Sequence, residues 1–383
     1  MLRFLLSVTL LTSVLSCQQR GFAPTTALPP AALQAQFNDP LNAQGTRNLE
    51  IRLYRSYGNE GTVYIKGRVV KAENQRPENP SDSSLLNFWR NLTSLSVKEI
   101  PNVKVAFSLN GQTQQLISDK EGMLQAPLKS FGTLKPGLHT LEARLVPGQP
   151  YQARPSQETL VVQAERNPTV GFVSDIDDTI KISNVTNKLK SLRRLLFSNA
   201  YTVGPVPGTA VLYQILDQRL DGQSNNGDAH YLSGSPLNLA TSIYTFMDFR
   251  QYPKGSVDLK KWGFSEGDDN PIHQENYKTE KLRQLFQAFP QRSFYLFGDS
   301  GEKDPEIYKT IAQEFPGRVK GIFINNVTRS QPNDPRFQGV YLTQSSTEQA
   351  QILQQQGLLS REDVAAVAQA TEADALFLQA NPL

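Results

Sequence analysis

Acidic side chains follow two short apolar runs that lie far apart in the 383-residue chain. Asp175 and Asp177 come after the run 170–173, and Asp299 comes after the run 294–297. Residues i and i+2 of an extended segment point the same way, so the first two carboxylates are expected to lie together. Burying such a pair is costly unless a divalent cation neutralises it or the two groups share a proton.

A hard divalent cation suits these residues better than zinc does. The chain contains one cysteine and three widely separated histidines, which nearly excludes a zinc site built from sulfur and imidazole ligands. With Asp299 as a third carboxylate and Asp304 as a fourth, the set consists of oxygen ligands that favour Mg²⁺. A magnesium ion held by few carboxylates generally binds a phosphate group as well, so these residues indicate phosphoryl transfer.

The elements that must position these residues alternate between short apolar runs and helical stretches. This alternation predicts an α/β domain over 166–345 with a doubly wound parallel sheet. The expected strands are 170–173, 231–232, 294–297 and 321–324, and helices are expected within 210–216 and 281–289. Ligands bind such sheets at the carboxyl ends of the strands, which is where Asp175, Ser233 and Asp299 stand.

Apolar and polar residues alternate between residues 49 and 165, as at Val63, Ile65 and Val69. Repeated runs of this kind, separated by turn signals, predict an N-terminal β-sandwich-like domain. One insertion, over 81–95, has helical spacing with Trp89 on its apolar face and a cap at Ser81 or Asp82. The region shows no catalytic constellation, and we interpret it as a structural or interaction module.

Residues 1–17 have the layout of a secretory signal peptide, with a basic start and an apolar stretch. They end in Val-Leu-Ser-Cys17, which resembles the lipobox of bacterial lipoproteins, and Cys17 is the single cysteine of the chain. The resemblance implies lipidation of Cys17 and attachment to a membrane surface of the cell envelope, with Gln18 favouring the outer membrane where one exists. A plain signal peptide or an uncleaved anchor is the alternative. Residues 18–48, rich in Ala, Pro, Gln and Asn, are expected to form a flexible tether.

Composition excludes several classes of protein. The 39 basic and 36 acidic side chains give a net charge of +3, which is too balanced for non-specific binding of nucleic acid. No apolar run reaches the ~18 residues of a membrane-spanning helix, which excludes a polytopic membrane protein. Two amphipathic helices are expected over 346–383, the first between Ser345 and Gly357 and the second capped by Ser360 and Asp363.

The segment 175–179, Asp-Ile-Asp-Asp-Thr, matches the DxDxT signature of haloacid-dehalogenase-like phosphohydrolases. The later motifs of that superfamily follow in order, with Ser233 after the second strand, Lys278 just before a helix, and the segment 298–304 after the third strand. Longer matching stretches point to one family within that superfamily. Over about 165–345 the sequence resembles the actin-patch-associated phosphatidate phosphatase family. These stretches are 175–181, 231–236, 253–263 and 298–308. The resemblance implies Mg²⁺-dependent conversion of phosphatidic acid to diacylglycerol and phosphate.

The family resemblance also implies roles for the residues that match its motifs. Asp175 would be the nucleophile that forms a phospho-aspartyl intermediate. Asp177 would act as general acid toward the leaving alcohol and then as general base for water. Ser233 and Gly234 would bind the phosphoryl group, and Lys278 would offset its charge.

The same resemblance implies a metal site. Mg²⁺ would be held by Asp175, by Asp299 and by the backbone carbonyl of Asp177, with Asp304 ligating it or orienting a ligand. Asp178 is expected to be an exposed turn residue.

Some residues near the motifs allow two interpretations. Lys281 is a rival of Lys278, because it lies about one helical turn further on. His230 and His273 are interpreted as structural. A basic amphipathic helix over 188–197 could dock on anionic lipid or could present a solvated face.

Two departures from the family pattern bear on the substrate. They are Gly234 with Leu237 in the second motif, and Tyr277 before the lysine. A soluble phosphomonoester is therefore a second hypothesis for the substrate. A non-catalytic envelope lipoprotein with a binding role is a third hypothesis, from a different class of function.

Overall fold

The computed structural model describes residues 47–72, 77–94, 97–129, 131–164, 169–183, 199–222, 226–261 and 274–380. All of these residues belong to one compact unit, Thr46–Leu383. Several predictions concern residues that the structure does not describe. They are the signal peptide over 1–17 with Cys17, the helix over 188–197, His273, and residues 18–46 of the tether expected over 18–48.

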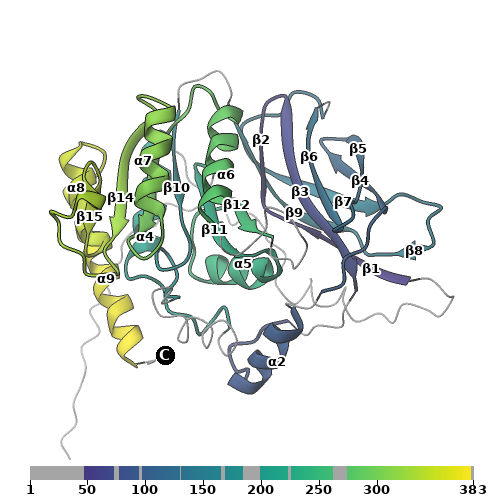
Figure 1. Ribbon diagram of the computed structural model, residues 1–383, viewed down its shortest axis with the longest axis horizontal. Coiled ribbons are helices and arrows are strands. Elements are labelled where there is room, and N and C mark those ends of the chain that lie inside the picture. The colour runs from purple at the N-terminus through teal and green to yellow at the C-terminus, as the bar shows by residue number, and fades with distance from the viewer. Residues whose placement is uncertain are drawn as a thin grey trace, which may run out of the picture. The chain divides into compact units, whose positions relative to one another are not determined.

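A parallel sheet forms the α/β part of the chain (Figure 1). Its six strands are arranged in the order β12-β11-β10-β13-β14-β15. They are β10 (Val170–Ser174), β11 (Ala229–Pro236), β12 (Gly255–Lys260), β13 (Ser293–Asp299), β14 (Val319–Asn325) and β15 (Tyr341–Thr343). The four strands expected from apolar runs are confirmed. Strands β12 and β15 were not predicted, because the first mixes polar and apolar residues and the second is only 3 residues long.

Helices cover both faces of this sheet. They include α4 (Thr209–Asp221), α5 (Ala240–Phe249), α6 (Gln274–Ala288) and α7 (Asp304–Glu314). Successive residues of a strand point to opposite faces, and so Phe172 packs with α4 and α5 whereas Val173 packs with α6 and α7. Figure 1 shows α6 and α7 side by side across the strands. The two expected helices are confirmed, but Lys278 lies inside α6 and not before it.

Two further helices, α8 (Ser346–Gln355) and α9 (Arg361–Ala380), end the described chain. The predicted caps are confirmed. The Ser345 hydroxyl accepts a hydrogen bond from the Glu348 amide at 3.2 Å. The Ser360 hydroxyl accepts from the Asp363 amide while the Asp363 carboxylate accepts from the Ser360 amide, which is a capping box. No described helix is both long and apolar enough to cross a bilayer.

The N-terminal part is a separate sheet that folds over on itself. Its strands are β1 (Arg47–Leu53), β2 (Ser56–Asn59), β3 (Thr62–Lys71), β4 (Lys104–Leu109), β5 (Gln112–Ile117), β6 (Met123–Lys129), β7 (Gly137–Leu145), β8 (Tyr151–Gln152) and β9 (Ser156–Gln163). Hydrogen bonds join them in the order β5-β4-β7-β9-β2-β3-β1-β8, and β6 also pairs with β3. Strand β1 lies against β7 and β9, which are not its hydrogen-bonded neighbours, and the sheet thereby encloses a core that includes Ile51, Val105 and Leu160. The coarser prediction of a separate N-terminal β-sheet is confirmed.

The helix α2 (Ser84–Ser94) confirms the insertion expected over 81–95. Its cap is the Ser83 hydroxyl, which accepts from the Leu86 amide at 3.3 Å, and is therefore later in the chain than we expected. Trp89, on the apolar side of the sequence pattern, is 57% exposed.

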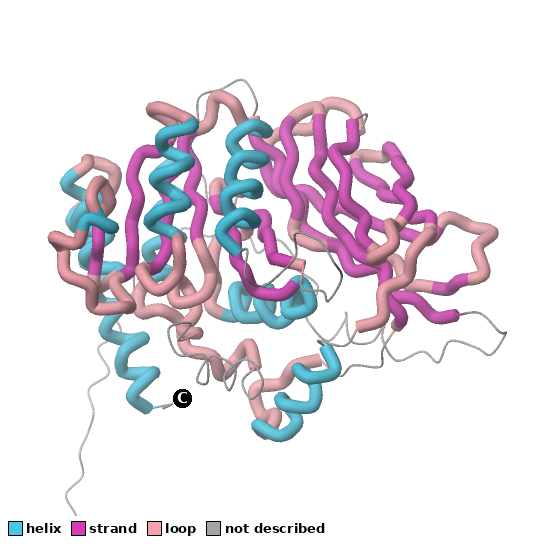
Figure 2. Tube along the Cα trace, viewed as in Figure 1, coloured by secondary structure: helices cyan, strands magenta, loops and turns pink. Residues whose placement is uncertain are grey.

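The N-terminal sheet is joined to the parallel sheet along the edge strand β12. The Val257 amide donates to the Arg55 carbonyl at 3.0 Å, and the buried Lys66 ammonium pairs with Asp258 at 2.9 Å. Figure 2 shows strands dominating the N-terminal part, whereas most helices gather around the parallel sheet. The N-terminal sheet thus covers the β12 edge of the parallel sheet, so that this edge is not open to the addition of another strand.

Candidate active site

The order of the strands places the ends of β10 and β13 next to each other. The chain moves outwards from β10 to β12 and returns to begin β13 beside β10. Ser174 pairs with Phe297 in the register, and the Asp175 amide donates to the Phe297 carbonyl at 2.9 Å. Asp175 and Asp299 are both fully buried at this edge of the sheet. Two aspartates that are far apart in the sequence therefore lie at one strand boundary.

Lys278 supplies the positive charge at this edge. Its ammonium donates to Asp175 Oδ1 at 2.8 Å, to Glu302 Oε2 at 2.8 Å and to Asp304 Oδ1 at 2.7 Å. The Lys278 side chain is 1% exposed, so its ammonium is shielded from solvent where it makes these contacts. Lys281 is partly exposed and donates to a glutamine of its own helix. The structure therefore brings Lys278, and not Lys281, to the aspartates.

The loop 299–304 folds around its own carboxylates. Asp299 Oδ1 accepts the amides of Gly301 at 2.6 Å and Glu302 at 3.2 Å. Asp304 Oδ2 accepts the Asp299 amide at 3.2 Å. A Cβ atom at Gly298 would lie 2.5 Å from Asp304 Oδ2, so glycine at this position lets Asp304 approach the end of the strand.

Asp177 faces a different set of partners. Its Oδ1 accepts from the Ser183 hydroxyl at 2.6 Å and pairs with Lys181 at 3.0 Å. Its Oδ2 accepts from the hydroxyls of Ser233 at 2.8 Å and Ser235 at 2.5 Å. Burial alone would raise the pKa of Asp177, but the Lys181 charge and the hydroxyl donors hold this pKa below its usual value. The carboxylate is therefore ionised, and it is not one of the groups that Lys278 contacts.

The carboxyl groups near Lys278 have raised pKa values, in contrast to Asp177. Burial raises the pKa of Asp175 well above its usual value, against the opposing charge of Lys278. Burial and the neighbouring Asp304 likewise raise the pKa of Asp299. Burial would lower the pKa of Lys278, but the surrounding carboxylates raise it well above its usual value. One ammonium is thus shared among several carboxylates, and the cluster is short of positive charge.

The same residues fit a hard divalent cation. Ligand oxygens of Asp175, Glu302 and Asp304 all lie within 4.8 Å of one another. Asp175 Oδ2 and Asp299 Oδ2 are buried and have no hydrogen-bond partner among the described residues. A buried carboxylate oxygen without a partner is costly, and a cation would satisfy it. An all-oxygen donor set is the one that Mg²⁺ prefers.

Glu302 was not among the residues predicted for the site. It stands in the loop between Asp299 and Asp304, and this position was the signal that could have identified it. Ser233, expected to bind a phosphoryl oxygen, donates its hydroxyl to Asp177 and accepts the Ser235 amide at 2.8 Å. Gly234 lies between these two serines in β11.

The prediction that Asp178 is exposed is wrong. Asp178 is 5% exposed, because the turn after β10 folds back over it. Its carboxylate accepts the Ser183 amide at 2.6 Å, and its carbonyl accepts from Asn325 at 3.0 Å. Its φ of 58° lies in the left-handed region, which aspartate tolerates better than most residues. Asp178 therefore shapes the turn that carries Asp175 and Asp177.

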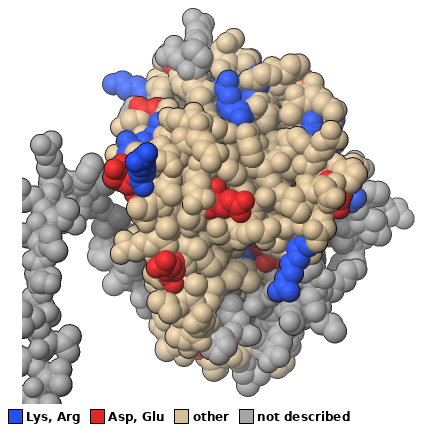
Figure 3. Space-filling view, turned by 90° about the vertical axis from the view of Figure 1, so that its left-hand side faces the viewer, with Lys and Arg blue, Asp and Glu red and all other residues tan. Residues whose placement is uncertain are grey.

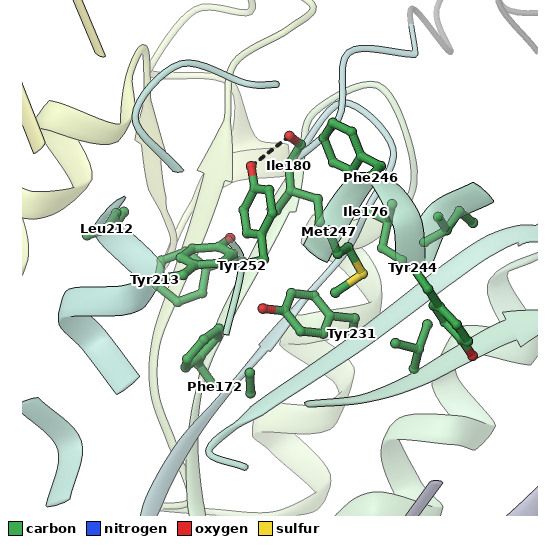
Figure 4. Packing of buried hydrophobic residues seen from close by; sticks show 14 of the residues in the cluster. Phe172, Ile176, Ile180, Leu212, Tyr213, Tyr231, Tyr244, Phe246, Met247 and Tyr252 are labelled. Atoms are coloured by element: carbon green, nitrogen blue, oxygen red, sulfur yellow. Dashed lines mark hydrogen bonds between the residues drawn. The ribbon is translucent and has the colours of Figure 1, made fainter. Parts of the chain in front are cut away.

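Buried tyrosines hold both ends of this turn, and Figure 4 shows the Tyr252 hydroxyl pointing toward Ile180. The hydroxyls of Tyr213 and Ser174 lie 2.9 Å apart, and Ser174 also donates to the Asp175 carbonyl at 2.6 Å. The Tyr252 hydroxyl donates to the Ile180 carbonyl at 2.9 Å, the bond dashed in Figure 4. Both ends of the segment 174–180 are thereby tied to the apolar core.

His230 contacts none of these groups. It is buried in β11 with its Nδ1 2.7 Å from the Ser256 hydroxyl, and its ring packs against Tyr57 and Phe289. This environment agrees with the structural role that we expected.

Charged side chains on the face drawn in Figure 3 are scattered among neutral ones. Within the described part of that face, blue and red groups lie singly or in small mixed groups. The described residues of that face therefore form no continuous basic stripe of the kind that follows a nucleic-acid backbone.

Comparisons with known proteins bear on the α/β part. Residues 170–326 match the family model described as "Phosphatidate phosphatase APP1, catalytic domain". Phosphatidate phosphatase APP1 of Saccharomyces cerevisiae is 30% identical over 183 residues, which are 48% of this chain and 30% of the yeast protein. An uncharacterized protein of Schizosaccharomyces pombe is 26% identical over 160 residues, which are 41% of this chain and 25% of that protein. The chain thus matches less than a third of the length of either relative.

The family resemblance expected from the motifs is confirmed for the matched segment. That segment contains Asp175, Asp177, Lys278, Asp299 and Asp304. Among solved structures, a carbohydrate acetylesterase from Xanthomonas citri aligns with a TM-score of 0.24 at 11% identity, over 70% of this chain and 57% of that one. A similarity this low does not indicate a shared fold or function.

Proposed function

We propose that this chain, whose residues 170–326 match the catalytic domain of phosphatidate phosphatase APP1, hydrolyses the phosphate monoester of phosphatidic acid to diacylglycerol and phosphate. The observation that carries the proposal is the cluster of buried Asp175, Lys278 and Asp304 with the partly buried Glu302 within that matched segment. Such a cluster can receive a phosphoryl group and a hard cation together. We assign the domain to the haloacid-dehalogenase-like superfamily with a doubly wound sheet, on the basis of the strand order and the DxDxT turn.

Asp175 is the nucleophile of the proposed reaction. One of its carboxylate oxygens bonds to phosphorus as the bond from phosphorus to the glycerol oxygen breaks, which leaves an acyl phosphate on Asp175. Water then attacks this phosphorus, the bond from phosphorus to Asp175 breaks, and phosphate leaves.

Asp177 moves the protons. It donates one to the leaving alcohol and takes one from the attacking water. Its pKa is held low by Lys181 in the structure, so we infer that the negative charge of a bound phosphate offsets Lys181 and allows Asp177 to become protonated. Ser233 and Gly234 then bind the phosphoryl oxygens, together with Lys278.

Mg²⁺ is the cofactor we propose, held by Asp175, Asp299 and the backbone carbonyl of Asp177, with Asp304 and Glu302 close by. When bound, the ion neutralises negative charge on the phosphoryl oxygens. The fit rests on the oxygen donor set and on the two buried carboxylate oxygens that lack partners among the described residues. We further propose that lipidated Cys17 holds the enzyme at a membrane surface of the cell envelope, where its lipid substrate resides.

Phosphate release from phosphatidic acid vesicles, with Mg²⁺ and with EDTA, tests the proposal. We expect Asp175→Asn to abolish Mg²⁺-dependent release, while Asp363→Asn, a capping carboxylate remote from the cluster, retains it. Undiminished activity of Asp175→Asn, or release that EDTA does not affect, would refute the assigned mechanism. Hydrolysis of sugar phosphates or nucleotides without hydrolysis of phosphatidic acid would assign a soluble substrate instead. A protein inactive on the whole panel would support the binding lipoprotein.

A further inference from the structure

Arg336 contacts the loop that carries three of the clustered carboxylates. It lies in the short helix η3 (Pro335–Phe337), beyond the segment 170–326 that matches the catalytic family. Its guanidinium donates to the backbone carbonyl of Ser300 at 2.5 Å and to the backbone carbonyl of Glu302. One side chain from outside the matched segment thus binds two backbone carbonyls within the loop 299–304.

The guanidinium is itself held in place on several sides. Glu306, in the first turn of α7, accepts from Arg336 Nε at 2.6 Å and from Nη2 at 3.1 Å. Asp334 caps the short helix by accepting the Arg336 amide at 2.9 Å, and Lys309 donates to the Arg336 carbonyl at 2.7 Å. Both the backbone and the side chain of Arg336 are therefore anchored, and its fork can hold the loop at low cost in conformational entropy.

The position of Glu302 depends on the backbone that Arg336 binds. The Gly301 amide donates to Asp299 Oδ1, so the Ser300 carbonyl of the same peptide unit faces the other way, toward Arg336. Ser300 is buried, and its amide donates to the Asn325 carbonyl at 2.9 Å, whereas Gly301 and Lys303 are exposed. The support from packing therefore weakens after Ser300, in the part of the loop that carries Glu302. Without Arg336, the carbonyls of Ser300 and Glu302 would exchange a charged donor for water, and the backbone that carries Glu302 would be less restrained.

We propose that Arg336 is a positioning residue that holds the loop 299–304 in the conformation that binds the divalent cation. This inference rests on the proposed function only through the metal site. Arg336 touches neither Asp175 nor Lys278 in the described contacts, and it acts through the backbone of Ser300 and Glu302. Partners that orient metal ligands typically contribute about ten- to a hundredfold to metal affinity.

Direct measurement of Mn²⁺ binding tests the proposal without relying on catalysis. Free Mn²⁺ is titrated by electron paramagnetic resonance against the wild-type chain, Arg336→Ala and Arg336→Lys. The control is Arg283→Ala, which removes a comparable two-contact pair with Glu314 at 2.7 and 2.5 Å between α6 and α7, away from the loop. Hydrogen exchange of the amides of Gly301 and Glu302 provides a second readout in the absence of metal.

We expect Arg336→Ala to weaken Mn²⁺ binding by about ten- to a hundredfold, and Arg336→Lys, which keeps one donor direction, to lie between it and the wild type. The two loop amides should exchange faster in Arg336→Ala, and Arg283→Ala should change neither readout. Phosphatase activity of Arg336→Ala should recover at saturating Mg²⁺, which separates weakened metal binding from lost chemistry.

Wild-type affinity and exchange in Arg336→Ala would overturn the proposal while leaving the proposed function intact. A wild-type chain that binds no Mn²⁺ would overturn both. A chain that binds Mn²⁺ in an Arg336-dependent manner but releases no phosphate would support the positioning role and refute the proposed function.

Discussion

Replacing Lys278 with methionine tests whether its ammonium neutralises the buried carboxylates. Methionine keeps much of the length and apolar volume of the lysine stem but removes the charge that Asp175, Glu302 and Asp304 share at 2.7–2.8 Å. Removing one partner from a buried ion pair typically costs about 3–5 kcal/mol, because the remaining charges lose their compensation. We therefore expect the free energy of unfolding of Lys278→Met to fall by about this amount at pH 7.5 without divalent cations.

The pH dependence distinguishes this electrostatic loss from a packing defect. Burial already raises the pKa of Asp175, and the loss of Lys278 raises it further. A carboxyl whose pKa is higher in the folded than in the unfolded state contributes stability that is lost as the pH rises. The deficit of Lys278→Met should therefore shrink toward pH 5.5, by up to about 1.4 kcal/mol per pH unit for each proton taken up.

Urea denaturation followed by circular dichroism, at pH 5.5 and 7.5 with and without Mg²⁺, measures these terms. Mg²⁺ should recover part of the deficit in Lys278→Met, since a bound cation replaces the missing charge. Lys281→Met is the matched control on the same helix and should stay within about 0.5 kcal/mol of the wild type. A deficit that is equal at both pH values and insensitive to Mg²⁺ would refute the reasoning, as would a variant as stable as the wild type.

Two further predictions concern residues outside the cluster. Burial holds the pKa of His230 well below its usual value, so the wild-type free energy of unfolding should fall as the pH drops below about 6.5. His230 should contribute up to about 1.4 kcal/mol per pH unit to this fall. Urea titrations across pH 5–7 should show that the free energy of unfolding of His230→Phe changes less steeply with pH, and an unchanged pH dependence would contradict this assignment. Arg68, 2% exposed, donates to Asn238 Oδ1 at 2.9 Å and so ties β3 to the segment after β11. Arg68→Ala should therefore lower the free energy of unfolding by about 1.5–3 kcal/mol in urea denaturation, and a loss below about 0.5 kcal/mol, typical of an ordinary surface position, would count against the tie.

Local pattern sufficed to predict the strands that carry the aspartates. The apolar runs before Asp175 and Asp299 are short and end in polar turns, and such a signal does not depend on distant parts of the chain. The strand β12 and the cap of α2 were less predictable, because mixed polarity and neighbouring hydroxyl residues permit more than one local solution.

Side-chain partners across elements could not be predicted in the same way. The helix phase alone leaves Lys278 and Lys281 nearly equivalent, and the choice depends on which face of α6 packs on the sheet. Asp177, two residues from Asp175, was expected to share its environment, yet the turn directs it to Ser183, Ser233 and Lys181.

The sequence by itself determined the acidic chemistry of this protein: aspartates at strand ends, hardly any sulfur or imidazole to compete with them, and the order of the motifs. Tertiary structure decided which groups share one buried volume, bringing Glu302 into the cluster and placing Arg336 behind its loop. The physical reason is that strand and turn signals act over a few residues. Contacts at about 3 Å, by contrast, depend on strand register and helix packing, which the whole chain must satisfy together.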